Sequence, residues 1–348
     1  MEISTKKLAD NMQRARLMAG ENRTLIAVVK CDSYGFGAVD CSKIFIENGA
    51  DMLAVATLNE GLELRRGGIT DTPIVVLGYT PPEVYNVAIE NNIQLTLFNI
   101  DDIETFVSSN ANIPLPLNAH IKLNTGMNRI GLDATSKSTI DSTVNIINKI
   151  AALPQINVSG VFSHFYGDYS QSTQQYNCFC ECVSALNFTP QFVHISASST
   201  LDKFITPIIN TARVGISLYR GAMTLKTRVV DIRILPIGAG VSYNHTYITD
   251  DVRKIATLGV GYGDGYPRIL SNKAKVRVNG GFADVIGNIC MDMCMIDATS
   301  VNNINIGDEV VLMGGKIDVE DIANLAETID YEIFTSINKR VPRVYTQD

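Results

Sequence analysis

The chain has 348 residues, of which 46% are hydrophobic, with 29 Lys and Arg against 36 Asp and Glu. This length predicts a large α/β barrel or two domains, and the apolar fraction excludes an intrinsically disordered chain. A net charge of −7 offers no basic surface for a phosphate backbone, so we expect a small-molecule partner and no nucleic acid.

The first two thirds of the chain alternate short β-branched apolar runs with amphipathic stretches of helical period. Eight strands are predicted, at 25–30, 52–56, 74–77, 93–97, 118–123, 158–164, 192–196 and 213–218. Helices are predicted at 38–48, 57–66, 82–91, 101–109, 137–152 and 171–186, the second opened by the capping box of Thr57 and Glu60. Eight such units predict a (β/α)8 barrel. An open doubly wound sheet is disfavoured because no Gly-x-Gly-x-x-Gly follows the first strand.

After about residue 225 the chain becomes β-rich, with turns marked by Gly and Asn. Strands are predicted at 229–234, 254–260, 274–278, 283–286, 295–296 and 309–312, and a helix at 319–329. We therefore expect an α/β plus all-β protein, with a barrel over 1–230 and a β-rich domain over 231–348.

The seven cysteines form no disulfide framework and no Cys-x-x-Cys motif, which predicts reduced thiols and a cytoplasmic chain. Cys178, Cys180 and Cys182 could form a metal site, but thiols two residues apart on a helix diverge. They indicate buried packing, and no metal is expected. No apolar run is long enough for a membrane span, and the N-terminus lacks a signal-peptide core, so this chain itself should not contact a membrane.

Reactive side chains occur where several predicted barrel strands end, which is where barrels carry their sites. Lys30 closes the first strand, and a buried ammonium is costly unless it is paired or covalently engaged. It suits a Schiff base, or alternatively reaches solvent at the rim. Lys122 and His164 close two other strands, although His164 and His194 also fit as buried structural histidines. Ser198 and the segment 214–216 lie where barrels hold phosphate, and lysine plus phosphate indicates pyridoxal phosphate.

Seven segments, in order along the chain, resemble motifs of the alanine racemase family, which are fold-type III pyridoxal-phosphate enzymes. They are 28–37 (VVKCDSYGFG), 121–131 (IKLNTGMNRIG), 213–216 (RVGI), 241–243 (VSY), 261–267 (GYGDGYP), 290–292 (CMD) and 340–343 (RVPR). The resemblance covers nearly the whole chain, and it implies a racemase of small amino acids with pyridoxal 5′-phosphate as cofactor.

The resemblance implies that Lys30 binds the cofactor and acts as acid and base on one face of the substrate's α-carbon, with Tyr262 on the other. Two groups flanking a planar carbanion are the simplest arrangement for racemisation. A free tyrosine has a pKa near ~10, so it needs a positive neighbourhood, and His164 and Arg213 match the family's network for this. Arg213 also matches the residue that hydrogen-bonds the pyridine nitrogen and keeps it unprotonated.

The other site residues follow from the same resemblance. Those that match the phosphate site are Tyr34, Ser198, Gly215 and Ile216. Arg129 matches the residue that contacts the cofactor's phenolic oxygen and the substrate carboxylate, and Met291 matches a backbone contact to that carboxylate. Lys122 matches a lysine that is carbamylated in part of the family. Asn124 and Asn128 differ from the residues that the family has nearby.

In the family, the equivalents of Tyr262 and Met291 act across a subunit boundary. The resemblance therefore implies a homodimer with shared active sites, in which the β-rich domain completes the site of the partner chain.

One position departs from the family in an informative way. Alanine racemases carry a tyrosine just before Arg-Val-Pro-Arg, near the phosphate and the substrate methyl, where this chain has Asn338. A shorter amide side chain favours a hydroxymethyl over a methyl. In this substitution the chain is similar to the membrane-bound serine racemases of vancomycin resistance. We therefore expect interconversion of L- and D-serine, with alanine racemase activity, to supply modified cell-wall precursors in glycopeptide resistance.

Three alternatives are kept. An ordinary alanine racemase differs only around Asn338, a barrel decarboxylase is disfavoured by Arg213, and a non-catalytic cofactor carrier is disfavoured by Tyr262 and the second domain. Family chains usually enter the fold through Trp-x-Glu-Ile, whereas this sequence begins inside that stretch. The start suggests the cytoplasmic domain of a longer membrane-anchored protein, and a naturally short N-terminus is the other interpretation.

Overall fold

The computed structural model describes residues 1–110 and 114–347, which form two compact units. We call them the barrel unit (Ala9–Ser33 and Ala38–Leu218) and the β-rich unit (Met1–Leu8, Tyr34–Gly37 and the chain from Tyr219 onward). Each is described by itself.

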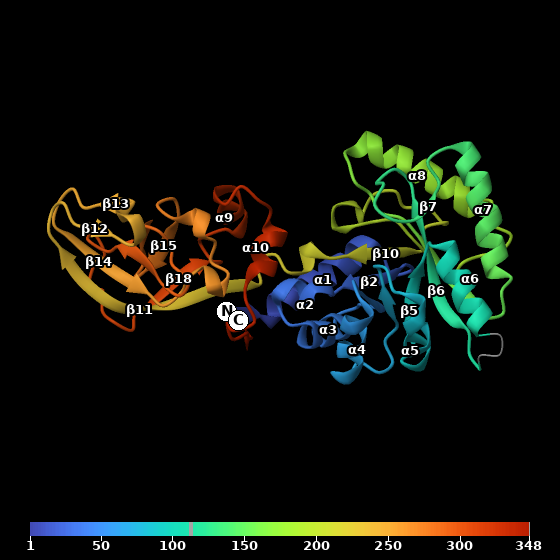
Figure 1. Ribbon diagram of the computed structural model, residues 1–348, viewed down its shortest axis with the longest axis horizontal. Coiled ribbons are helices and arrows are strands. Elements are labelled where there is room, and N and C mark those ends of the chain that lie inside the picture. Colours follow the sequence, from blue (N-terminus) through green and yellow to red (C-terminus); the bar gives the residue numbers. More distant parts are fainter. Residues whose placement is uncertain (111–113, 348) are drawn as a thin grey trace. The chain divides into compact units, whose positions relative to one another are not determined.

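The barrel unit is built on parallel strands in the order β10-β2-β3-β4-β5-β6-β8-β9 (Figure 1). Their bounds are β2 Thr24–Val28, β3 Met52–Val55, β4 Ile74–Val76, β5 Ile93–Leu97, β6 Leu117–Asn124, β8 Ile156–Phe162, β9 Phe192–His194 and β10 Thr211–Val214. A short strand β7, Leu132–Asp133, pairs with β6. Between β9 and β10 the described residues form no backbone ladder, and the Asn210 side chain instead accepts the Val193 N–H at 2.9 Å. The predicted eight-stranded α/β barrel is confirmed, nearly closed.

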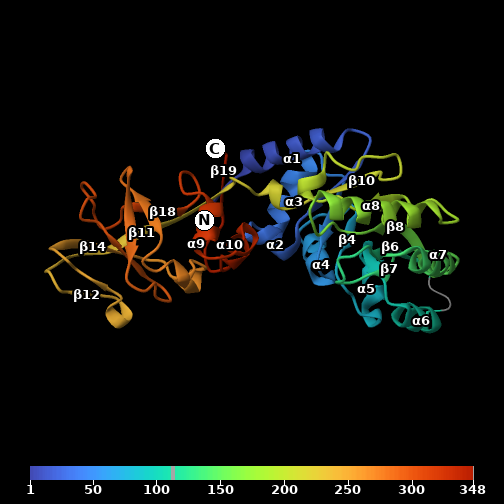
Figure 2. The same cartoon turned by 90° about the horizontal axis from the view of Figure 1, so that it is seen from above.

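Helices surround these strands, and Figure 2 shows the same helices from above. Their bounds are α1 Thr5–Ala19, α2 Lys30–Gly35, α3 Ala38–Glu47, α4 Leu58–Arg66, α5 Tyr85–Glu90, α6 Ile100–Ser109, α7 Lys137–Ala151 and α8 Tyr169–Ser184. The capping box of Thr57 and Glu60 is confirmed at the start of α4. Helix α7 shows why the periodicity was informative, because Ile140, Val144 and Ile147 are all buried along one face.

The strand ends differ from the prediction at two site residues. Strand β2 ends at Val28 and β8 at Phe162, so Lys30 and His164 each lie two residues beyond a strand instead of closing it. The sequence pattern does not mark these strand ends, because Val29 and Ser163 stay buried after the β-ladder has ended. The sequence pattern does not predict helix α1, because its mean hydropathy is low and its polar residues obscure the helical period.

The β-rich unit is an eight-stranded sheet in the order β14-β17-β16-β15-β18-β11-β1-β19, and all its pairs are antiparallel except β1 with β19. Its strands are β1 Glu2–Ser4, β11 Met223–Leu235, β14 Arg253–Leu258, β15 Lys275–Val278, β16 Gly281–Ile286, β17 Cys294–Asp297, β18 Glu309–Met313 and β19 Val344–Thr346. A small hairpin pairs β12 Gly240–Val241 with β13 Tyr247–Ile248.

The predicted helix 319–329 is two helices, α9 Val319–Leu325 and α10 Asp330–Ser336. Glu327 between them has φ +58°, a left-handed conformation that ends α9. Helix α10 matters for the site, because the chain leaves it directly before Asn338.

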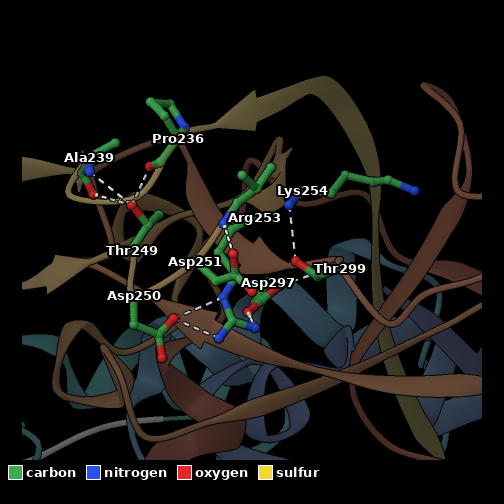
Figure 3. Close-up of polar contacts among 10 residues, drawn as sticks. Pro236, Ala239, Thr249, Asp250, Asp251, Arg253, Lys254, Asp297 and Thr299 are labelled. Atoms are coloured by element: carbon green, nitrogen blue, oxygen red, sulfur yellow. Dashed lines mark hydrogen bonds and ion pairs between the residues drawn. The ribbon is translucent and has the colours of Figure 1, made fainter.

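The loop that carries the β12–β13 hairpin is fixed by one buried hydroxyl (Figure 3). Thr249 donates to the carbonyl of Pro236 at 2.6 Å and accepts the N–H of Ala239 at 2.8 Å. Nearby, Arg253 bonds Asp250 at 2.6 Å and lies 3.4 Å from Asp297. These contacts hold the chain that leads into Ser242 and Tyr243.

All seven cysteines are free thiols. None of the helices in the described part of the chain has the length and apolar character needed to span a bilayer.

Candidate active site

Lys30 opens an unusual turn at the end of β2. The four residues after it, Cys31 to Tyr34, have φ between 52° and 54°, so the chain makes one left-handed helical turn without glycine. Left-handed backbone costs about 1–2 kcal/mol per residue for side chains with a Cβ. Such a segment persists only where its surroundings hold it, and strained backbone of this kind is concentrated at functional sites.

Three hydrogen bonds within the barrel unit hold this turn. The N–H of Cys31 donates to Glu60 Oε1 at 2.6 Å, and the N–H of Ser33 donates to the Val29 carbonyl at 2.9 Å. Asp32 Oδ1 accepts the N–H of Ala38 at 2.7 Å, which ties the turn to the start of α3. Glu60 also accepts the N–H groups of the α4 N-terminus, so that helix fixes the backbone beside Lys30. Sequence reasoning gave Glu60 only a capping role.

Burial lowers the pKa of Lys30, and the positive charge of Arg129 lowers it further. Both effects favour the neutral amine, which is the nucleophilic and basic form of lysine.

Arg213 lies at the end of β10 and is held by two histidines. Its Nη1 donates to His194 Nδ1, and its Nη2 donates to His164 Nδ1 at 3.1 Å and to the Ser163 carbonyl at 2.7 Å. Arginine has no acceptor, so both Nδ1 atoms must be unprotonated and each neutral ring carries its hydrogen on Nε2. Burial, followed by the charge of Arg213, lowers the pKa of His164 to about 3, which keeps that ring neutral.

The Arg213 Nε–H has no acceptor among the residues that the structure describes, although the side chain is only 4% exposed. Burial lowers the pKa of Arg213 to about 9, as expected for a guanidinium removed from water. The Nε atom is not itself closed off from solvent, so this donor is open to a ligand that brings an acceptor atom.

Two short helical turns are joined by a hydrogen bond in the barrel unit. They begin at Ser198 and at Ile216, and the N–H of Gly215 donates to Ser198 Oγ at 3.0 Å, which joins them. The first N–H groups of a helical turn have no partner within the turn, and that of Gly215, just before the second turn, is bonded to Ser198. Tyr34 belongs to the β-rich unit, where its ring packs 4.8 Å from that of Tyr219.

Lys122 is buried beside two arginines, and no carboxylate among the described residues pairs with it. Its side chain is 4% exposed, its ammonium donates to the Leu123 carbonyl at 3.1 Å, and it lies 5.0 Å from the centre of the Phe162 ring. Burial, and then the charges of Arg213 and Arg129, hold its pKa well below the ordinary value. Arg129 is exposed and makes no ion pair within the described residues.

Asn124 and Asn128, the positions that depart from the family, contact each other. Asn124 Nδ2 donates to Asn128 Oδ1 at 2.9 Å, and Asn124 Oδ1 accepts the Asn128 N–H at 2.9 Å. The pair closes the turn before Arg129 without adding charge.

The β-rich unit brings the three remaining site residues together. The N–H of Tyr262 donates to the Cys290 carbonyl at 3.0 Å, that of Gly263 to the Met291 carbonyl at 2.8 Å, and that of Asn338 to the Asp264 carbonyl at 3.1 Å. A Cβ on Gly261 would lie 2.2 Å from the Cys290 carbonyl, so only glycine allows this approach. Arg340 bridges Asp264 and Asp292, each at 2.8 Å, an ion-pair network that the sequence did not reveal.

Comparison with known proteins identifies the family. The family model described as Alanine racemase, N-terminal domain, matches residues 3–222, and Alanine racemase, C-terminal domain, matches residues 222–345. An alanine racemase of Clostridium novyi (strain NT) is 39% identical over 376 aligned positions, covering 100% of this chain and 95% of that protein. The chain belongs to the alanine racemase family.

Solved structures of alanine racemases agree with the fold. The alanine racemase of Clostridium difficile 630 has a TM-score of 0.92 at 33% identity, covering 99% of this chain and 94% of that one. An alanine racemase of Bartonella henselae with covalently bound pyridoxal phosphate has a TM-score of 0.89, covering 99% and 98%; at 24% identity this likeness shows the fold alone. Alanine racemases are pyridoxal 5′-phosphate enzymes, so membership of the family confirms the expected cofactor.

Proposed function

We propose that this chain is a pyridoxal-phosphate-dependent alanine racemase, the alternative to a serine racemase. The observation that carries the proposal is Arg213, a buried, donor-only side chain fixed by two neutral histidines, whose Nε–H has no acceptor among the described residues. An unprotonated pyridine nitrogen is an acceptor that fits this donor. A decarboxylase would need a carboxylate here, and a non-catalytic carrier would not need the β-rich unit.

When bound, the cofactor supplies an electron sink for the pair that remains when the substrate loses its α-proton. Lys30 would hold the cofactor and, as a neutral amine, would accept or return that proton on one face. By the family resemblance, the hydroxyls of Ser198 and Tyr34 and the N–H groups of Gly215 and Ile216 would hold the phosphate, with the Gly215 N–H giving up its bond to Ser198 Oγ. These assignments are supported by the strained Lys30 turn and by the hydrogen bond that joins the turns beginning at Ser198 and Ile216.

The substrate carboxylate is bound by Arg129, which is exposed and unpaired within the described residues, together with the backbone at Met291 of the partner subunit. We assign the proton on the opposite face to Tyr262 of the partner subunit. The Nε2–H of His164 is fixed as a donor by Arg213, so it can stabilise a phenolate.

Exposure in the single chain supports the homodimer with shared sites. The side chains of Tyr262 and Met291 are 43% and 54% exposed, although their backbones are tightly bonded to each other's loops. Met293, beside them, is 50% exposed. Large apolar groups exposed together are typical of a surface that another chain covers.

The test is direct. Purified chain loaded with pyridoxal phosphate should interconvert L- and D-alanine, measured as loss of circular dichroism of the amino acid in both directions. Protein freed of the cofactor is the control and should be inactive. If the loaded protein racemised neither alanine nor serine, the proposal would be overturned.

Lys122 should carry a carbamate. Its neutral amine attacks the carbon of carbon dioxide, a C–N bond forms, one C=O electron pair moves to oxygen, and the nitrogen loses a proton to water. The resulting carbamate replaces the buried amine with an anion beside the positive charges of Arg213 and Arg129. Protein equilibrated with ¹³C-bicarbonate should show one carbamate signal in ¹³C NMR, absent in Lys122→Ala, with kcat/KM reduced about tenfold. Absence of the ¹³C carbamate signal from the unsubstituted protein would contradict the carbamate at Lys122.

Serine is the second candidate substrate, and Asn338 is the observation that favours it. Its Oδ1 accepts the N–H of Arg340 at 3.0 Å, while its Nδ2 has no acceptor in the described part of the chain. That amide is a free donor that suits a hydroxymethyl group. The proposal of a serine racemase of the vancomycin-resistance type depends on Asn338. The relatives named above are alanine racemases and give it no support.

Asn338→Tyr tests this preference. A hydroxyl buried without a partner loses ~1–3 kcal/mol, so the amide can shift preference by roughly one to two powers of ten. We expect the ratio of kcat/KM for serine to that for alanine to fall, while the alanine value holds or rises. If this ratio in Asn338→Tyr stays within about twofold of that in the unsubstituted protein, Asn338 does not set a serine preference and the ordinary alanine racemase is the better interpretation.

A further inference from the structure

A chain of buried polar side chains runs across the interior of the barrel unit, away from Lys30. It starts at Arg213 on β10, passes through His194 on β9 and His120 on β6, and ends at Gln94 on β5. His194 Nε2 lies 2.9 Å from His120 Nδ1, and His120 Nε2 lies 3.0 Å from Gln94 Oε1. Ser159 Oγ on β8 donates to the same Gln94 oxygen at 2.8 Å.

We propose that Gln94 and His120 are positioning residues that fix the hydrogen-bond direction of this chain and thereby hold Arg213 in place. The proposal rests on the proposed function only for the role of Arg213.

The two ends of the chain determine its direction. Arginine can only donate, so His194 must accept at Nδ1 and carry its hydrogen on Nε2. That hydrogen is donated to His120 Nδ1, which leaves the hydrogen of His120 on Nε2. The Gln94 amide oxygen can only accept, so it completes the chain. Both histidines are therefore neutral Nε2–H tautomers, and reversal at either ring would place two donors or two acceptors face to face.

Burial reinforces this state. His120 and His194 are fully buried, and Gln94 is 8% exposed. Desolvation, followed by the charge of Arg213, lowers the pKa of His120 to about 3 and that of His194 well below its usual range. Of the charged groups near His194, Arg213 and Lys122 are both positive, so a protonated ring would face repulsion that no carboxylate in the described part of the chain offsets.

The backbone of β8 is shaped for the His120 ring. A Cβ on Gly160 would lie 2.6 Å from His120 Nδ1 and 2.7 Å from two ring carbons. The ring also stacks on Phe192, with centroids 5.5 Å apart. Gly160 and Phe192 thus confine the His120 ring and help to fix the position of its Nδ1 against His194. Strands β9 and β10 share no ladder in the described structure. The hydrogen bond from Arg213 to His194 is therefore also one of the links between these two strands.

Gln94→Glu is the informative substitution, since it keeps the shape and adds one negative charge. A carboxylate at this end stabilises a doubly protonated His120, whose new Nδ1–H would then face the Nε2–H of His194. Two donors cannot bond, so the contact must open and Arg213 must lose its fixed partner. Gln155→Glu is the matched control, because Gln155 is also 8% exposed and lies in the barrel unit outside this chain.

The measurement is long-range ¹H–¹⁵N NMR of the full-length enzyme, with cofactor, labelled at its four histidines. In the unsubstituted protein, His120 and His194 should both show neutral Nε2–H patterns from about pH 6 to about pH 9. In Gln94→Glu, His120 should show the imidazolium pattern, and kcat/KM for racemisation should fall about 10–100-fold. Gln155→Glu should change neither.

Gly160→Ala provides a second variant that alters no polar group. It should displace the His120 ring, remove the signature of the His120 to His194 bond, and lower kcat/KM in the same direction. An Nδ1–H tautomer at either ring of the unsubstituted protein would overturn the proposal. So would variants at Gln94 and Gly160 that keep the native histidine spectra and activity. The NMR result does not depend on racemisation, so failure of the proposed function would be recognised separately.

Discussion

Replacing Lys30 by alanine should abolish racemisation and the covalent attachment of pyridoxal phosphate together. Lys30 is the lysine that the left-handed turn presents, with an amine whose pKa is lowered by burial and by Arg129. Loss of both the attachment and one of the two proton carriers should cost at least about 10³-fold in kcat. The purified native protein should absorb in the visible, and borohydride should remove that band and leave the label on the Lys30 peptide.

Lys43→Ala is the control, since Lys43 is an exposed lysine on α3 in the same unit. It should keep the visible band, the label and the activity. A label that persists on the protein in Lys30→Ala, or that maps to another peptide of the native enzyme, would show that a different lysine binds the cofactor.

Tyr262→Phe should affect the two directions of racemisation unequally. If Lys30 serves one face of the α-carbon and Tyr262 the other, removal of the phenolic oxygen stops proton transfer on one face only. General acid and base groups contribute about 10²–10⁴-fold, so solvent deuterium exchange should fall by that order for one enantiomer. By family resemblance, this is the L form. The other enantiomer should still exchange its α-proton through Lys30.

Exchange is followed by NMR in deuterated solvent, starting from each enantiomer separately. Tyr169→Phe is the matched control, because Tyr169 is 71% exposed and lies on α8. Undiminished exchange of both enantiomers in Tyr262→Phe would refute its role. An equal loss for both would instead indicate that Tyr262 supports the whole site, against the assignment to one face.

The cluster in the β-rich unit explains why Tyr262 was identified only through a motif. Its glycines allow the loop to approach the Cys290 and Met291 carbonyls, and Asp264 then pairs with Arg340. The residues that hold this loop, Cys290, Met291 and Arg340, are all far from Tyr262 in the sequence. The motif marked the residue, whereas the contacts that hold its loop come from segments more than about twenty residues away and carry no local signal.

The sequence by itself determined the alternation of strands and helices, the change to a β-rich domain, and the position of Lys30 in a recognisable motif. These features depend on local periodicity and turn chemistry, which neighbouring residues carry. Tertiary structure alone decided that Lys30 lies in a left-handed turn held by Glu60, and that Arg213 and Gln94 direct the hydrogens of two histidines. Both depend on donors and acceptors from different strands, and hydrogen-bond direction is fixed only when those strands meet in the folded barrel.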